Sequence, residues 1–543
     1  MTYFVPSDDD LAALAAFAPE LGNALRDVGF STDGLHQVLG KAGMAALDRG
    51  EPAAVAAAIK QFHQRQAKDS YQAATNTPGA HQQLPLALEG LLLRTPIDWH
   101  EVFPDALVAQ LESAHIIHEG AITVDIRPIQ LSTDTPEVNH DFLIFSDFDS
   151  SMDQRIPGLN HVLGVGRASR SLLDITPKDP VESIFDLGGG CGVQALGQTA
   201  SKHITLSDIH PRAIVFSRIT MLANGLGKKL DDGHIELLTG SWFEPVVGRK
   251  FDRIVGNPPF VVSDGDVDLV YRDSTFDLDG ATAHILANVK DYLANDGTAH
   301  FLGAWVHVQG QSWQSRIASW LPSEGVEAWI VQRDVADPAQ YVGTWLRDES
   351  LDPRSAEGQE KATRWLEHFA RAGVDGIGFG YITIQKIDGP SSVVCEEMPQ
   401  PLYGPFHLEA SEYLERMAWL RDKDASAILN ESFSVRDSAV VDRVSPAHIG
   451  FSSSAADWTP TTTISRVDGP AWSHEIDETV ATILNALLPD ANLATTINVM
   501  DMLGAFDDAD VEEIKANLVP IIVDLMRHGI VLPSACLSGP GKD

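Results

Sequence analysis

The chain has 543 residues, several times the usual size of one domain, so its length alone predicts two to four domains. Hydrophobic residues make up 44% and charged residues 21%, which excludes a disordered or fibrous chain. No apolar run approaches the ~20 residues that span a bilayer. The acidic start at Asp8–Asp10 is unlike a secretory signal. Three cysteines, Cys191, Cys395 and Cys536, are too few for a disulfide framework or a four-cysteine zinc site. We therefore expect a soluble, reduced, cytoplasmic protein without a metal.

The net charge of −37 is concentrated in the two ends of the chain. Residues 1–150 carry −13, residues 151–320 carry −4 and residues 321–543 carry −20. Wholesale binding to a phosphate backbone depends on Lys and Arg, so this balance disfavours it. A local basic patch in the nearly neutral middle of the chain remains open.

Residues 1–95 are predicted to form a helical N-terminal domain. Leu11, Leu14 and Phe17 recur at the spacing of one helix face, and further apolar helical stretches follow near 35–48 and 52–66. Residues 96–150 read as a connector that is winged-helix-like or a β-hairpin, with strands expected at 121–127 and 142–145.

Residues 151–390 alternate between strand and helix patterns, which predicts an α/β domain with a mostly parallel sheet. A helical insertion is expected near 337–372. Strands are expected at 183–187, 203–207, 235–238, 251–255, 299–304, 328–332 and 377–386.

Residues 391–543 are predicted to form an α+β accessory domain, for which a winged-helix-like fold is one alternative. The proline-containing segment 391–401 is expected to be its linker. A strand at 461–466 and helices at 475–488 and 510–527 are predicted, and Pro520 is expected to kink or split the last helix.

The first chemical signal is the run Phe185-Asp186-Leu187-Gly188-Gly189-Gly190-Cys191-Gly192-Val193. An apolar strand, then glycines, then a helix is the build of a nucleotide-binding turn, since glycine lets the backbone pass close to a ligand. A tight turn with nothing bound has the same pattern.

The second signal is Asp208, which ends the next strand 18 residues after Gly190. A carboxylate at this place can accept hydrogen bonds from both hydroxyls of a ribose. The alternative role is a helix N-cap, which Pro211 at the following helix start also allows. The two signals together predict a ligand that contains a nucleoside.

The third signal is Asn257-Pro258-Pro259-Phe260 at the end of the fourth strand. Here the sequence resembles the class I S-adenosylmethionine-dependent methyltransferases that carry an (Asn/Asp)-Pro-Pro-(Tyr/Phe) motif. That group includes adenine-N6 and guanine-N2 methyltransferases of DNA and RNA, and release-factor glutamine-N5 methyltransferases. The resemblance implies a Rossmann-like seven-stranded sheet, covers residues 180–305 most specifically and extends more loosely to about 388. The whole chain resembles large acidic methyltransferases of high-GC bacteria.

The motif suits transfer of a methyl group to a planar NH2, whose lone pair is delocalised. The Asn257 side-chain oxygen and the Pro258 carbonyl can each accept one N–H, which orients the lone pair and stabilises developing positive charge. Pro259 stiffens the turn together with Pro258, and Phe260 is expected to stack on the flat group. No metal or thiol nucleophile is required.

The resemblance also implies a cofactor site for S-adenosylmethionine. Asp186 and the turn Gly188–Gly192 are expected to face its methionine and sugar, Asp208 its ribose and Ile209 its adenine. In many relatives an Asp at this place contacts the adenine amino group. This chain has Ser241 there, beside Trp242, and Ser241 could make the same contact. The cofactor-binding set is therefore Asp186, Gly188, Gly189, Gly190, Cys191, Gly192, Asp208, Ile209, Ser241, Trp242 and Asn257, with Cys191 expected to act as small packing.

Two further segments are candidates for covering the cofactor or substrate. Gly164 and Gly166 lie in the segment 161–171 before the first strand, where relatives cover the methionine end of the cofactor; an ordinary loop is the alternative. Tyr271 and Arg272 follow the Asn-Pro-Pro-Phe motif in an acidic insertion, and Arg272 is expected either to meet an anionic substrate group or to pair with neighbouring Asp residues.

The motif does not distinguish a nucleobase from an amide. An adenine or guanine amino group of RNA or DNA is the first alternative, and it predicts a basic patch near Lys228, Lys229, Arg249, Lys250 and Arg253. A protein glutamine amide is the second, which the acidity favours. A non-catalytic scaffold that binds S-adenosylmethionine is the third. Oligomeric state does not follow from the sequence.

Overall fold

The computed structural model describes residues 4–72, 80–131, 140–148, 152, 158, 160–259, 261–262, 276–348, 351–404, 406–444, 461–506 and 510–536. The chain divides into two compact units. Unit 1 comprises residues 1–173 and 178–397, and unit 2 comprises residues 174–177 and 398–543. Each unit is described by itself.

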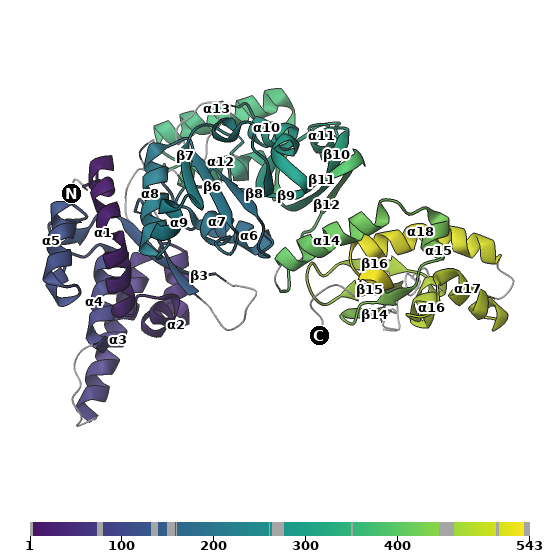
Figure 1. The fold of residues 1–543 in the computed structure, drawn as a ribbon, viewed down its shortest axis with the longest axis horizontal. Coiled ribbons are helices and arrows are strands. Elements are labelled where there is room, and N and C mark those ends of the chain that lie inside the picture. The colour runs from purple at the N-terminus through teal and green to yellow at the C-terminus, as the bar shows by residue number, and fades with distance from the viewer. Residues whose placement is uncertain are drawn as a thin grey trace. The chain divides into compact units, whose positions relative to one another are not determined.

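The N-terminal part of unit 1 is helical, as the apolar spacing predicts. Ser7 caps the first helix in a capping box with Asp10, and Leu11 and Leu14 are fully buried on its inner face. The helices are α1 (Asp8–Asp27), α2 (Thr32–Asp48), α3 (Pro52–Gln72), α4 (Ala80–Leu93) and α5 (Asp105–Ser113). Figure 1 shows them in purple to blue, with α1 beside α8 (Pro211–Ala223).

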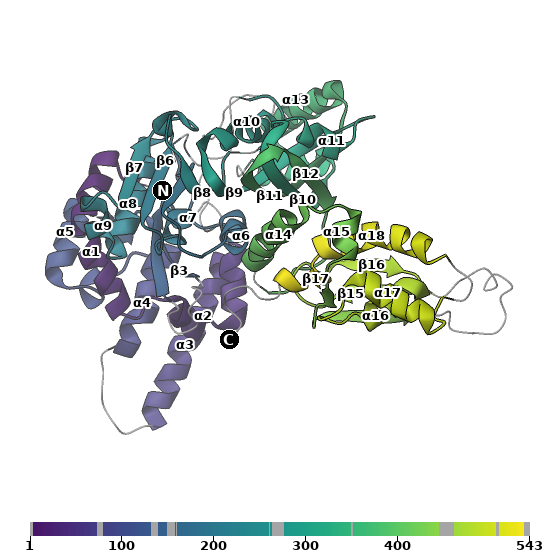
Figure 2. The same cartoon turned by 45° about the vertical axis from the view of Figure 1, so that its right-hand side comes forward.

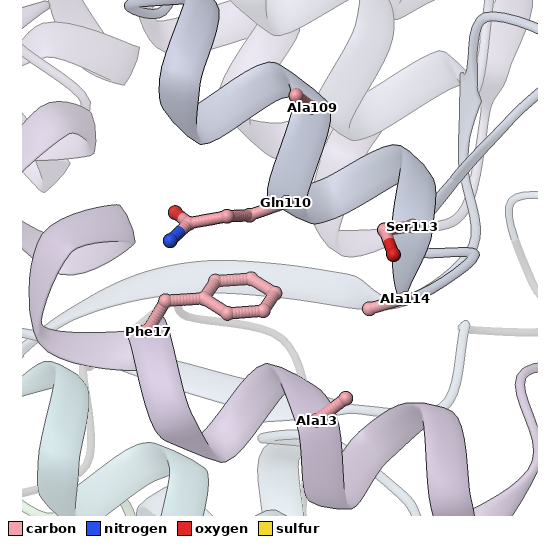
Figure 3. Close-up of a pocket in the computed structure, with 6 residues that line it drawn as sticks. All are labelled: Ala13, Phe17, Ala109, Gln110, Ser113 and Ala114. Atoms are coloured by element: carbon pink, nitrogen blue, oxygen red, sulfur yellow. The ribbon is translucent and has the colours of Figure 1, made fainter.

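Helices α1 and α5 border a small groove (Figure 3). Phe17 lies on its floor, where α1 departs from helical geometry with φ −121° and ψ 15°. Pro19 follows closely and lacks the N–H that would bond one turn back, which explains the local break. The other lining residues are Ala13, Ala109, Gln110, Ser113 and Ala114.

Short strands follow the helices. The strand predicted at 121–127 is divided into β2 (Ala121–Ile122), which pairs with β1 (Ile117–His118), and β3 (Asp125–Leu131). Strand β3 pairs antiparallel with β4 (His140–Ser146), which contains the predicted strand at 142–145. The hairpin alternative for residues 96–150 agrees with this pairing, and the division into domains stays a prediction.

The centre of unit 1 is a mostly parallel sheet with the strand order β12-β10-β11-β9-β8-β5-β6-β7. Its ends are visible in Figures 1 and 2, with β10, β11 and β12 together at one side. Every predicted strand is present. The strands are β5 (Ser183–Leu187), β6 (His203–Asp208), β7 (Ile235–Thr239), β8 (Phe251–Gly256), β9 (Leu293–Val308), β10 (Glu324–Ala336), β11 (Val374–Pro390) and β12 (Ser392–Glu397).

The sheet has eight strands, not the seven that were predicted. The additional strand, β12, pairs parallel with β10 and lies inside the segment 391–401 that was expected to be a linker. The linker interpretation was therefore wrong for residues 392–397. The prolines flank this strand without interrupting it, and Val393 and Cys395 pack on the buried core, which explains why it joins the sheet edge.

Alternate residues of β5 belong to opposite cores of the sheet, as the period of two requires. Ile184 packs in the core that includes α8 and the N-terminal helices. Phe185 and Leu187 pack in the core that includes α10 (Gly280–Asn288) and α11 (Trp313–Ala318). The sheet is buried on both faces. Because β5, β6, β7 and β8 run parallel, their carboxyl ends lie at one edge of the sheet. The other helices of this part are α6 (Arg167–Ile175), α7 (Val193–Leu196), α9 (Gly227–Asp231), α12 (Pro338–Asp348) and α13 (Ala356–Ala372).

In its described residues, unit 2 combines helices with two small antiparallel sheets, in agreement with the α+β prediction. The strand predicted at 461–466 is β15, whereas the helix predicted from 475 begins at Glu478 because β16 occupies the preceding residues. Helix α18 continues unbroken through Pro520. The elements are α14 (Phe406–Leu420), α15 (Ala425–Leu429), β13 (Phe433–Val435), β14 (Ala439–Val444), β15 (Thr461–Arg466), β16 (Ser473–Ile476), α16 (Glu478–Ala486), α17 (Leu493–Met502), α18 (Val511–Arg527) and β17 (Val531–Pro533).

Candidate active site

A cavity of about 620 Å³ lies at the carboxyl ends of β5, β6, β7 and β8. This is the edge at which open α/β sheets bind ligands, and the volume is in the range of small-molecule sites. Its lining residues are His161–Gly164, Gly166, Ala168, Ser169, Leu187–Cys191, Val193, Gln194, Ser207–His210, Ala213, Gly240–Trp242 and Asn257–Pro259.

The glycine-rich turn forms one wall of the cavity. Gly188 and Gly190 have φ values of +71° and +55°, which glycine adopts without steric cost. The amides of Gly188 and Gly189 both donate to the Ser207 carbonyl oxygen at 2.9 Å. A Cβ on Gly189 would lie 2.3 Å from Cγ of Leu206. The turn therefore needs glycine for its backbone conformation and for its close approach to β6.

Asp208 stands at the end of β6 and lines the same cavity. Its Oδ2 accepts a hydrogen bond from the Gly190 amide at 3.0 Å, and its Oδ1 accepts one from the His210 amide at 2.8 Å. Burial raises the pKa of Asp208, and these amides partly oppose the shift. The carboxylate is thus held in place by the turn before any ligand is considered, and its contact with a ribose stays a prediction.

Asp186 and Gly192 lie behind the turn and do not line the cavity. Asp186 is fully buried; its Oδ2 accepts from the Ala195 amide at 3.0 Å, and Oδ1 has no hydrogen-bond partner among the described residues. Burial raises the pKa of Asp186 to about 7, despite that amide hydrogen bond. Gly192 begins α7 with φ +82°. Direct contact of these two residues with a cofactor stays a prediction.

Cys191 lines the cavity but is unsuited to nucleophilic chemistry. Its side chain is buried, and burial raises the pKa of the thiol to about 12. The thiol is therefore protonated at neutral pH, whereas the reactive form of cysteine is the thiolate. This agrees with the packing role expected for it.

The Asn-Pro-Pro motif forms the facing wall. Asn257, Pro258 and Pro259 follow the last residue of β8 and line the cavity. A Cβ on Gly188 would lie 3.9 Å from Cα of Pro258, so the turn and the motif are adjacent. The Asn257 Oδ1 atom is buried and has no hydrogen-bond partner among the described residues. Because a buried acceptor without a donor costs free energy, this atom points to a ligand that donates a hydrogen bond.

Ser241, Trp242 and Ile209 line the same cavity as Asp208, and their contact with adenine stays a prediction. Trp242 has φ +49°, which is rare for a residue with a Cβ. Its ring lies 5.8 Å from that of Phe276 and 5.3 Å from that of His284. Burial lowers the pKa of His284, which keeps its ring neutral near pH 7.

The candidate cover segment also reaches the cavity, since Gly164 and Gly166 are among its lining residues. A Cβ on Gly164 would lie 2.8 Å from Oγ of Ser146, so the close approach at this glycine is to β4. A Cβ on Gly166 would meet no atom within 4 Å. Phe260, Tyr271 and Arg272 lie outside the described residues.

His161 and Ser169 lie in the predicted cover segment 161–171 and line the cavity, whereas sequence reasoning missed Gln194. Gln194 is buried and donates from Nε2 to the Ser169 carbonyl oxygen at 2.8 Å, which joins α7 to α6. The signal available for Gln194 was its place in the first turn of the helix after the glycines.

Most of the residues of the predicted basic patch are engaged within unit 1. Arg253 is buried against Asp179, Arg249 pairs with Glu236, and the ammonium groups of Lys229 and Lys250 donate to backbone carbonyl oxygens. A patch of unpaired cations is therefore not formed by these four residues. Among the described residues, no helix is long and apolar enough to cross a membrane.

Comparison with known proteins places this cavity in a known family. Residues 157–277 match the family described as methyltransferase small domain. This part of the chain is therefore similar to the methyltransferase small domain. The match spans the cover segment, the glycine turn, Asp208 and the Asn-Pro-Pro motif. Its cofactor class is S-adenosylmethionine, in agreement with the resemblance. Residues 411–533, within unit 2, match a domain of unknown function, DUF7782.

The curated relatives include both substrate classes. A release factor glutamine methyltransferase of Aliivibrio fischeri is 36% identical over 140 residues, which cover 23% of this chain and 45% of that protein. A ribosomal RNA small subunit methyltransferase C of Serratia proteamaculans is 35% identical over 108 residues, covering 19% and 29%. The chain thus spans less than half the length of these relatives. Among solved structures, a tRNA m1G37 methyltransferase of M. jannaschii is 11% identical with a TM-score of 0.25, covering 49% of this chain and 55% of that one.

Proposed function

We propose that the whole protein is an S-adenosylmethionine-dependent N-methyltransferase that acts on a planar amino or amide nitrogen of a macromolecule. One observation carries this proposal. The Asn257 Oδ1 atom is a buried acceptor without a partner among the described residues, and it belongs to the same cavity as the glycine turn. A cofactor site without methyl transfer would not require an acceptor at this place.

The cavity residues fit S-adenosylmethionine. The volume of about 620 Å³, the glycine turn that lines it and the carboxylate of Asp208 suit a ligand with a ribose and an amino-acid portion. Ser241, Trp242 and Ile209 would border its adenine. When bound, this cofactor supplies an electrophilic methyl group on a sulfonium.

Asn257 and Pro258 would present the acceptor nitrogen to that methyl group. The side-chain oxygen of Asn257 and the backbone carbonyl of Pro258 each accept one N–H of the substrate, so the nitrogen lone pair turns away from both oxygens. Positive charge that develops on the nitrogen strengthens both hydrogen bonds, which lowers the barrier. Pro259 adds rigidity to the turn. The nitrogen becomes acidic after transfer, and water can then take its proton.

The partners of the predicted basic residues bear on the choice between the two substrate candidates. The nucleobase candidate predicted a basic patch, but Lys229, Arg249, Lys250 and Arg253 are engaged within unit 1. Nucleic-acid affinity depends on cations that can replace phosphate counterions. This pairing, together with the net charge of −37, favours a protein amide, most simply of glutamine, over a nucleobase.

The decisive experiment follows a labelled methyl group from S-adenosylmethionine into fractionated lysate. Asn257→Ala is the test variant, and Asn430→Ala is the matched control, since Asn430 caps α15 in unit 2. Label that protease removes and that requires Asn257 supports the amide. Label that nuclease removes establishes the nucleobase instead. Cofactor binding without Asn257-dependent label in any fraction would leave only the scaffold alternative.

A further inference from the structure

Arg212 is a buried cation that the proposed reaction does not use. It lies in the first turn of α8, four residues after Asp208, and its side chain is only 7% exposed. Its Nε donates to Asp147 Oδ2 at 2.9 Å and its Nη2 donates to Asp147 Oδ1 at 2.6 Å. This bidentate pair requires the planar geometry of a guanidinium.

The same guanidinium also holds the start of the chain. Its Nη1 donates to the Pro6 carbonyl oxygen and to Asp8 Oδ1, both at 3.0 Å. Burial by itself lowers the pKa of Arg212, but the hydrogen bonds and charges of Asp147 and Asp8 outweigh that effect and raise it. The side chain therefore remains a cation that joins three segments far apart in the sequence.

Asp147 connects this cation to the wall of the cavity. Its Oδ2 accepts a hydrogen bond from the Val162 amide at 2.9 Å, and its own amide donates to the Val162 carbonyl oxygen at 3.0 Å. Val162 lines the cavity within the cover segment 161–166. The neighbouring Ser146 stands directly against Gly164. The carboxylate that Arg212 orients is thus the carboxylate that holds the cover segment.

A second arginine ties the N-terminal region to α8 without reaching the cavity. Arg26 donates to the Ala223 carbonyl oxygen at 3.0 Å and to Asn224 Oδ1 at 2.8 Å, at the opposite end of α8. Asn224 in turn bonds the backbone of Leu143 in β4. Arg26 therefore offers a matched comparison for Arg212, because it joins the same elements at a distance from the cover segment.

We propose that Arg212 is a positioning residue for the cofactor: through Asp147 it sets the cover segment 161–166, and through Pro6 and Asp8 it couples the N-terminal segment to the cavity. This inference rests on the proposed use of S-adenosylmethionine. Its physical basis is that the bidentate pair holds both carboxylate oxygens of Asp147. A side chain that cannot pair in this way leaves Asp147 free to turn away from the Val162 amide.

The test compares Arg212→Lys with Arg26→Lys in the full-length protein. Lysine keeps the charge but cannot make the bidentate pair. We expect Arg212→Lys to raise the Kd for S-adenosylmethionine at least about tenfold by calorimetry, which corresponds to ~1.4 kcal/mol. It should also speed hydrogen exchange at the Val162 amide in the ligand-free protein. Arg26→Lys, at an exposed residue, should lower Tm less and leave both readouts within about twofold of the wild type.

The variant Asp8→Ala tests the proposed coupling between the N-terminal segment and the cavity. Asp8 is 61% exposed, so its removal should cost little stability and raise the Kd by only about two- to threefold. Unchanged binding and exchange in Arg212→Lys, or equal changes in Arg212→Lys and Arg26→Lys, would overturn the positioning role. If the wild-type protein itself binds no S-adenosylmethionine, the proposed function fails as well, whereas wild-type binding without an Arg212 effect refutes this inference alone.

Discussion

The two walls of the cavity differ in how their polar groups are satisfied. On the glycine-turn wall, both carboxylate oxygens of Asp208 accept backbone amides, and the turn amides of Gly188 and Gly189 are bonded to β6. On the facing wall, Asn257 Oδ1 has no partner among the described residues. The first wall is preorganised by the chain itself and suits a cofactor. The second wall has an acceptor without a partner among the described residues, which suits a substrate that donates N–H groups.

The largest effect should come from the wall with the unsatisfied acceptor. Asn257→Ala should lower kcat by about 10²- to 10³-fold, because it removes one preorganised hydrogen-bonding group from the transition state. The Kd for S-adenosylmethionine should stay within about threefold. Single-turnover methyl transfer and calorimetry measure the two quantities separately. A large rise in Kd with unchanged kcat would reverse the roles assigned to the two walls.

Asp208→Ala should show the opposite pattern. The amides of Gly190 and His210 lose a charged acceptor, worth roughly 1.5–3 kcal/mol per bond, so the turn loosens and cofactor binding weakens about 10- to 100-fold. At saturating cofactor, kcat should fall less than in Asn257→Ala. Calorimetric titration is the measurement, and an unchanged Kd would contradict the cofactor role of this wall.

Gly189→Ala tests how tightly the preorganised wall is built. A Cβ would stand 2.3 Å from Leu206 Cγ, so the turn or β6 must shift, at a cost of about 1–3 kcal/mol. Thermal denaturation should show the loss. Gly166→Ala is the control, since its Cβ would meet no atom within 4 Å. Equal Tm values for both variants would contradict this close contact.

The raised pKa of Asp186, about 7, predicts a pH dependence of stability. Between pH ~4 and ~7 the folded ligand-free protein holds a proton that the unfolded chain has released, so the free energy of unfolding falls as pH rises through this window. Asp186→Asn removes that slope and can still accept from the Ala195 amide. Denaturant titrations at several pH values check this, and parallel curves for wild type and variant would refute it.

The smallest effect is expected at Cys191. Its thiol is protonated at neutral pH because burial raises its pKa to about 12, so Cys191→Ala should keep kcat within about twofold. Steady-state methyl transfer measures this. A loss of activity that Cys191→Ser restores would show that the wall uses this position chemically.

Local patterns predicted most of the elements of unit 1. Strand β5 has the predicted bounds 183–187, and α8 begins at Pro211. The linker assigned to residues 391–401 was wrong because prolines mark both a linker and the borders of an edge strand. Only pairing with β10 distinguishes the two.

The glycine turn, the Asn-Pro-Pro motif and the strands that precede them could be predicted from the sequence, because each depends on neighbours within a few residues. Only the tertiary structure decided which polar groups remain unsatisfied. The carboxylate of Asp208 accepts backbone amides and Asn257 Oδ1 has no partner among the described residues. Four of the five predicted cations of the basic patch are engaged, and Arg212 reaches Pro6, Asp8 and Asp147. These contacts join residues up to 206 positions apart, and no local pattern encodes partners at that separation.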